Sequence, residues 1–172
     1  MKNIACVLAL VLVPLAYDCA TAASLPLGTQ ELRLEGTLDP STGAGDEIDL
    51  SVSYGYFFAD NVQGGGRFSL LDNDLVSAVR IGGYVEYNFD TGTEIMPFLE
   101  GFVGFANVDI EDGKDDTTGI FEGRAGAKFF LTERVAIAGA GVFAYASEKI
   151  YQDDNALDDS DAYLELSLRC YF

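Results

Sequence analysis

Glutamates at alternating positions are the first residues in this 172-residue chain that could do chemistry. Two carboxylates held at a suitable distance can act as general acid and general base. Four glutamates are candidates for such a pair: Glu86, Glu100, Glu122 and Glu165. We favour salt bridges instead, because basic residues in the same stretches are present in matching number: Arg80, Arg124, Lys128 and Arg169.

Other catalytic and binding chemistries have little support in the sequence. The chain contains no histidine, so a Ser/His/Asp relay cannot be assembled. The Gly64–Gly66 run lacks the lysine and the following helix of a phosphate-binding loop. A net charge of −18 makes nucleic acid an improbable partner. We therefore expect no enzyme active site, no cofactor and no nucleic-acid partner.

Two acidic segments could hold a hard divalent cation, since clustered carboxylates supply oxygen ligands. One runs from Asp109 to Asp116, and the other contains Asp153, Asp154, Asp158, Asp159 and Asp161. Their spacing does not fit an EF-hand, and runs of acids commonly form solvated surfaces. We predict no metal site but leave open an ion-mediated contact with lipopolysaccharide phosphates.

The elements that position these residues are strands, and the last of them is the clearest. From Ala162 to Phe172, apolar and polar residues alternate without interruption, which indicates a strand with one face of each kind. Its length suits a tilted transmembrane strand of about 9–11 residues. Seven earlier stretches have similar patterns: 29–38, 47–58, 62–70, 77–89, 95–106, 119–130 and 135–147.

The connections between these strands differ in length and charge. Those after the second, fourth and sixth are a few residues long, whereas longer polar segments follow the first, fifth and seventh. The longer ones include acidic loops at 107–118 and 148–161. Short turns at one rim and longer loops at the other are typical of transmembrane barrels. The sequence thus predicts an all-β fold, an eight-stranded antiparallel up-and-down transmembrane β-barrel with both ends on the short-turn side.

Alternation alone does not decide which face is inside, because a soluble lipocalin-like barrel has apolar residues within. The charges favour a polar interior. Charged residues on the polar face nearly cancel, as a closed interior requires because unpaired buried charge is costly. The seven acids are Glu31, Glu35, Asp49, Glu86, Glu100, Glu122 and Glu165. The six bases are Arg33, Arg67, Arg80, Arg124, Lys128 and Arg169. We predict that these residues form ion pairs inside the barrel.

Aromatic residues also favour the membrane interpretation, because they gather where strands meet the short turns. An interfacial aromatic girdle requires such a ring at one level. We predict its members as Tyr56, Phe57, Phe58, Tyr87, Phe89, Phe98, Phe129, Phe130, Tyr171 and Phe172. A second level is marked by Phe105, Phe121, Phe143 and Tyr145.

The first residues have the pattern of a cleavable signal peptide. Lys2 precedes an apolar run from Ile4 to Leu15, and small residues follow at 20–23. We predict a signal peptide at 1–23 and a barrel domain at 24–172. Two of the three cysteines lie in the signal, so the mature chain keeps Cys170 and has no internal disulfide.

With its terminal Tyr171-Phe172 and, more weakly, Met96–Gly101, the chain resembles the small eight-stranded outer-membrane barrels, such as the OmpA membrane domain and OmpX. The resemblance covers the whole predicted mature chain and concerns architecture. It implies an outer-membrane location, contact with membrane lipid and lipopolysaccharide, and recognition of Tyr171 and Phe172 by the barrel-assembly machinery. Enzymes of this class use a histidine base, which this chain lacks.

These observations favour a non-enzymatic structural or surface-interaction protein whose extracellular partner is unknown. A narrow channel for small solutes is one alternative, and a soluble barrel with an apolar ligand is another. Small residues on the polar face either leave gaps for solutes or accommodate large neighbours. These residues are Gly65, Gly82, Gly104, Gly126, Ala136, Ala138 and Ala140.

Overall fold

The computed structural model describes residues 25–38, 48–72, 76–110, 116–147, 151–153 and 156–172. The predicted signal peptide at 1–23 lies outside these residues. The strands are β1 (Gln30–Leu38), β2 (Ile48–Ala59), β3 (Val62–Asp72), β4 (Val76–Asn88), β5 (Ile95–Ile110), β6 (Asp116–Thr132), β7 (Val135–Ala146), β8 (Tyr151–Asp153), β9 (Ala156–Asp158) and β10 (Ser160–Tyr171). Within the described ranges, no helix is long and apolar enough to cross a membrane.

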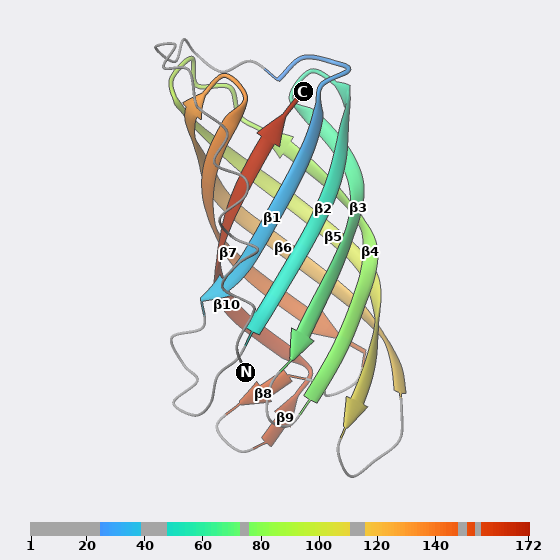
Figure 1. The fold of residues 1–172 in the computed structure, drawn as a ribbon. Helices are drawn as coiled ribbons and strands as arrows, with labels where there is room; N and C mark the ends of the chain where they lie inside the picture. Colours follow the sequence, from blue (N-terminus) through green and yellow to red (C-terminus); the bar gives the residue numbers. More distant parts are fainter. Residues whose placement is uncertain (1–24, 39–47, 73–75, 111–115, 148–150, 154–155) are drawn as a thin grey trace, which may run out of the picture.

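Eight of these strands close into one barrel in the order β1-β10-β7-β6-β5-β4-β3-β2, with antiparallel pairing throughout. The short strands β8 and β9 pair only with each other, at the end of the barrel opposite the C-terminus (Figure 1). Each strand of the barrel pairs with the next barrel strand along the chain, and β1 closes the barrel by pairing with β10. This topology confirms the predicted eight-stranded up-and-down barrel.

β1 begins and β10 ends at the rim that carries the short turns (Figure 1). The backbone N–H of Gln30 donates to the carbonyl of Phe172 at 2.9 Å, and the N–H of Phe172 donates back at 3.1 Å. The turn between β2 and β3 consists of Asp60 and Asn61, and Asn61 has a positive φ of 62°. Asparagine tolerates this left-handed conformation, which allows the tight reversal.

Two predicted loops contain more strand than the sequence indicated. β5 continues to Ile110 and β6 begins at Asp116, so strands occupy most of the predicted loop at 107–118. The predicted loop at 148–161 contains the β8–β9 hairpin. Backbone pairing does not need apolar side chains, so the ladder continues past the point where the alternating pattern stops.

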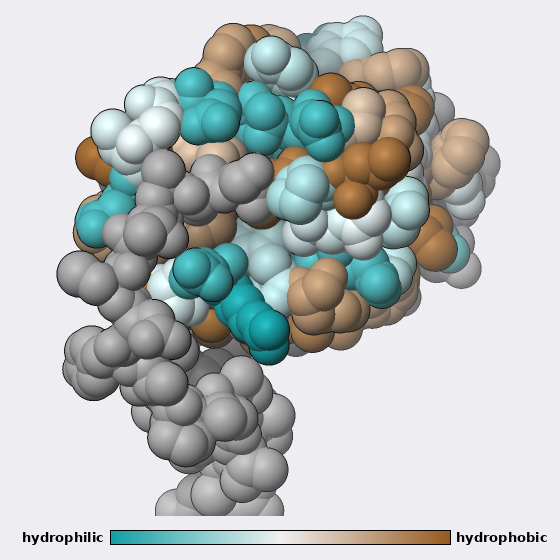
Figure 2. All heavy atoms as spheres, turned by 90° about the horizontal axis from the view of Figure 1, so that it is seen from above, coloured by the Kyte–Doolittle hydropathy of each residue, from teal (hydrophilic) through white to brown (hydrophobic). Residues whose placement is uncertain are grey.

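The two faces of the wall differ in burial as predicted for a membrane barrel. Charged side chains are buried inside, and large apolar side chains are exposed outside. Arg33 and Lys128 are 0% exposed, whereas Phe105 is 63% and Ile81 is 61% exposed. Viewed onto the short-turn end, hydrophilic residues lie among hydrophobic residues across the described surface (Figure 2). An apolar exterior around a polar interior contradicts the alternative of a soluble barrel with an apolar interior.

Glycines on the inner face make room for large neighbours. A Cβ built on Gly82 would lie 2.5 Å from Cζ of Phe102, and one on Gly104 would lie 2.6 Å from the same atom. Real Cβ atoms do not approach other atoms so closely. The phenyl ring of Phe102 and the backbone carbonyls of Ile81 and Val103 thus leave no room for a side chain at these two positions.

Candidate functional site

The barrel interior is the candidate site, because the charged residues singled out in the sequence converge there. Each comes from an alternating strand, so every second residue points inward. Twelve ionisable side chains from β1, β3, β4, β5, β6 and β10 are buried in the interior: Glu31, Arg33, Glu35, Arg67, Arg80, Glu86, Glu100, Glu122, Arg124, Lys128, Glu165 and Arg169. They comprise six acids and six bases. The thirteenth predicted member, Asp49, has a side chain outside the described part.

Arg33 on β1 connects the two ends of this network. Its Nη1 atom lies 2.6 Å from Glu100 Oε2 and 2.9 Å from Glu35 Oε1. Its Nη2 atom lies 2.8 Å from Glu31 Oε1 and 3.1 Å from Glu86 Oε2. A guanidinium group presents several donors in one plane, so one arginine can bind four carboxylates.

The group nearer the short turns is organised around Glu86 on β4. Lys128 Nζ donates to Glu86 Oε1 at 2.7 Å, and Arg169 Nη1 donates to Glu86 Oε2 at 2.7 Å. Gln63 Nε2 also donates to Glu86 Oε1, at 2.7 Å. Glu31 lies 3.3 Å from Lys128 Nζ and 3.6 Å from Arg169 Nη1. Both carboxylates are thus held by cations from β6 and β10.

The group nearer the loops is organised around Arg124 on β6. Its Nη2 atom donates to Glu122 at 2.7 Å, and its Nη1 atom donates to Glu165 at 2.9 Å. Arg67 on β3 donates to Glu100 and also lies 2.9 Å from Glu35 and 3.2 Å from Glu122. Arg80 Nη1 lies 3.8 Å from Glu122 Oε1.

These contacts join charged residues that the alternating pattern placed on one face of the strands, and that pattern does not indicate which residues pair. Each of the four candidate acid/base glutamates lies within 3 Å of at least one cation. Such charge-assisted contacts are short and direct the lone pairs of each carboxylate to fixed partners. The arrangement therefore favours an electrostatic network over an acid/base pair.

Aromatic rings cover several of the buried cations. The guanidinium carbon of Arg33 lies 4.8 Å from the ring centroid of Tyr84, and that of Arg169 lies 4.4 Å from Phe98. Arg67 lies 4.9 Å from the centroid of Phe102. Cation–π contacts of this kind stabilise a charge removed from water. An alternating pattern does not indicate which rings meet which cations, so these contacts could not be predicted.

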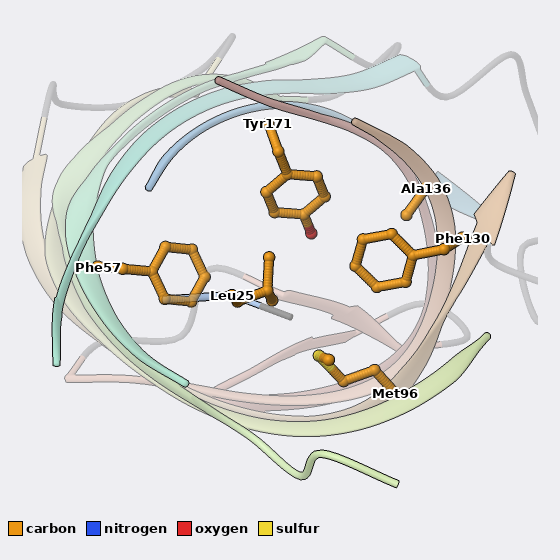
Figure 3. Close-up of a cluster of buried hydrophobic side chains, with 6 residues drawn as sticks. All are labelled: Leu25, Phe57, Met96, Phe130, Ala136 and Tyr171. Atoms are coloured by element: carbon orange, nitrogen blue, oxygen red, sulfur yellow. The ribbon is translucent and has the colours of Figure 1, made fainter. Parts of the chain in front are cut away.

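A cluster of apolar side chains closes the interior at the short-turn end. Leu25, which precedes β1, lies at the centre of the ring of strands, and side chains from the wall point toward it (Figure 3). Its carbonyl accepts a hydrogen bond from the N–H of Asn61 at 3.0 Å, which anchors the segment to the turn between β2 and β3. We call this cluster the plug: Leu25, Phe57, Met96, Phe130, Ala136 and Tyr171.

The plug corrects the predicted aromatic girdle. Four predicted members point inward and are at most 4% exposed: Phe57, Phe98, Phe130 and Tyr171. The other six project outward and are 42–61% exposed: Tyr56, Phe58, Tyr87, Phe89, Phe129 and Phe172. Adjacent residues of a strand point to opposite faces, so a run of aromatics cannot lie wholly in the girdle. The four residues marking the second level are all exposed.

The described residues do not contain a cluster of acids, cysteines or histidines that could hold a metal ion. The side chains of 109–116 and 151–158 lie outside the described part. The side chains of most acidic residues predicted as possible cation ligands therefore lie outside the described part.

No family model and no curated protein matches the sequence. Among solved structures, the N-terminal β-barrel domain of Pseudomonas aeruginosa OprF has a TM-score of 0.67 at 14% identity, covering 86% of this chain and all of that domain. Neisserial surface protein A has a TM-score of 0.59 at 16% identity, covering 84% of this chain and 95% of that one. The outer-membrane enzyme PagL has a TM-score of 0.50 at 15% identity, covering 83% and 98%. This chain therefore has the fold of the small eight-stranded outer-membrane β-barrels.

Proposed function

We propose that the protein is a non-enzymatic β-barrel of the outer membrane with a structural or surface-interaction role. The observation that carries this proposal is the reversed burial of the wall. Twelve charged side chains are enclosed and paired, while large apolar side chains face outward on every strand of the barrel. Exposing such a surface to water is unfavourable, whereas in a bilayer it contacts acyl chains.

In this proposal the longer connections face the outside of the cell, and both ends of the barrel chain face the periplasm. The acidic segments at 107–118 and 148–161 then lie on the outer side, where they can meet a surface partner. Tyr171 ends β10 and Phe172 follows it on the periplasmic side, where the assembly machinery would read them. The non-enzymatic role is supported by the lack of histidine and by the cationic partners of the interior glutamates.

The first test is the mobility of the protein in detergent gels, with and without boiling, after extraction from the outer-membrane fraction. A folded barrel migrates differently before boiling, and we expect this shift in the membrane fraction. Recovery of folded protein in the soluble fraction without detergent would overturn the proposed location.

A charge reversal tests the facing of the wall. Arg124→Glu places a fifth carboxylate beside Glu35, Glu100, Glu122 and Glu165. Losing one partner of a buried pair costs about 3–5 kcal/mol, and reversal adds repulsion, so we expect little folded protein. The unboiled gel band measures this directly. A band as strong as that of the wild type would mean that Arg124 is solvated.

The narrow-channel alternative is tested by conductance in planar bilayers. An eight-stranded barrel leaves just enough interior for side chains, and here ion pairs and the plug occupy it. We expect no steady current from purified protein. A reproducible single-channel current that tracks the folded protein would favour the channel.

A further inference from the structure

The outer face of the barrel wall has a concave area, which we call the hollow. A depression of about 840 Å³ lies over β5, β6, β7 and β10. Its base is formed by small outward-facing residues: Gly101, Gly123, Ala125, Gly141 and Ala162. Three larger outward-facing side chains border it: Leu99, Phe143 and Leu164.

The strand register brings these small residues together. Gly101 lies opposite Gly123, and Ala125 lies opposite Gly141 on the next strand. A Cβ built on any of these three glycines would meet nothing within 4 Å. Packing against the wall therefore does not require glycine at these positions, in contrast to Gly82 and Gly104 on the inner face.

The surroundings of the hollow are apolar. Phe143 and Leu164 are 60% and 56% exposed at its edge. Glu100 and Arg124 contribute to its lining, but both side chains are at most 5% exposed and bind partners in the interior. An occupant of the hollow therefore finds hydrocarbon and backbone, with no charged group to bind.

Along the strands the hollow is continuous with the apolar outer band of the barrel. Toward the loops, the next outward residues of β6 and β7 are Phe121 and Tyr145, which lie opposite each other. Toward the short turns, Phe129 lies opposite Ile137. The hollow thus lies between the Phe121–Tyr145 pair and the Phe129–Ile137 pair, within the band that would contact acyl chains.

We propose that this hollow binds an acyl chain of a membrane lipid, which lies against the glycines between Phe143 and Leu164. The proposal rests on the membrane location proposed above and adds a specific lipid contact to it. A flexible hydrocarbon chain fits an apolar depression without leaving polar groups unpaired, and its affinity comes from the apolar area that it covers.

The test is native mass spectrometry of the purified barrel in detergent with 1-palmitoyl-2-oleoyl-phosphatidylethanolamine. The filling variant is Gly101→Leu/Gly123→Leu, which places two large side chains on opposed positions of the hollow. The matched control is Gly66→Leu/Gly83→Leu, an opposed, exposed glycine pair on β3 and β4 outside the hollow. Gly141→Leu is a milder filling variant if the double variant folds poorly.

We expect the wild type and the control to retain a lipid molecule, and the filling variants to retain at least about fivefold less, equivalent to about 1 kcal/mol of binding free energy. Equal retention by folded wild type, filling variants and control would overturn the proposal. A wild-type dimer that the filling variants convert to monomer would also overturn it, in favour of a second copy of the chain. A heat-modifiable shift in the membrane fraction distinguishes these outcomes from failure of the proposed location.

Discussion

β1 and β7 pair with opposite edges of the same strand, β10, yet their inner faces differ completely. β1 presents three consecutive inward charges, Glu31, Arg33 and Glu35. β7 presents only small or apolar inward side chains: Ala136, Ala138, Ala140, Val142, Ala144 and Ala146. Both strands pair antiparallel with β10, so the difference lies in the side chains of the strands beside them.

The neighbours of β7 carry long side chains that need its space. Ala136 lies opposite Arg169 on β10, and Ala138 lies opposite Lys128 on β6. Both cations reach across the lumen to Glu86 on β4. Interiors are close-packed. In an eight-stranded barrel, a strand with long inward side chains therefore needs a neighbouring strand with small inward side chains. The alternating sizes of β7 and its neighbours thus determine where the charges fit.

Within the comparison of β1 and β7, the largest expected effect comes from removing the central charge of β1. Arg33→Met leaves four carboxylates without their shared partner and should lower the free energy of unfolding by about 3–5 kcal/mol. Urea titration in lipid vesicles, followed by the unboiled gel band, measures the change.

The matched control is Leu34→Met, one residue further along β1 and 40% exposed on the outer face. A volume-conserving change of this kind should cost less than about 1.5 kcal/mol. If the two variants lost equal stability, charge pairing would not distinguish the two faces of β1.

The second prediction concerns β7 and has an intermediate size. Ala138→Leu adds volume between its cross-strand partners Lys128 and Ser167. Overpacking in a filled interior should cost about 1–3 kcal/mol in the same titration. Ile137→Leu, on the outer face of the same strand, should be nearly neutral. A stabilising effect of Ala138→Leu would show that β7 borders an unfilled space.

Much of this contrast could be predicted from the sequence, because alternation reports the two faces of a strand. The strands, the inward charges and their near balance followed from a period of two. The partners did not follow. Arg33 and Glu100 are 67 residues apart and meet only because the barrel closes and fixes the register.

The plug shows a second limit of sequence reasoning. Leu25 lies before the first strand, where no repeating pattern indicates its direction. Phe57 lies between two outward-facing aromatic residues, Tyr56 and Phe58, and alternation requires the middle residue to face the opposite way. Phase within the strand, rather than aromatic content, could have placed it. In a membrane barrel, aromatic content does not tell whether a side chain points inward or outward, because both faces of the wall accept aromatic side chains.

Apart from the control variants, the smallest expected effect lies on β10, the strand that β1 and β7 share. Ser167 lies opposite Glu35 on β1 and opposite Ala138 on β7, and its hydroxyl accepts a hydrogen bond from Arg169 Nε at 3.2 Å. Ser167→Ala removes this contact, but Arg169 keeps its ion pair with Glu86. We therefore expect a loss of about 1 kcal/mol, near the usual contribution of one hydrogen bond. A loss as large as that of Arg33→Met would mean that the network depends on its hydroxyl groups as much as on its charges.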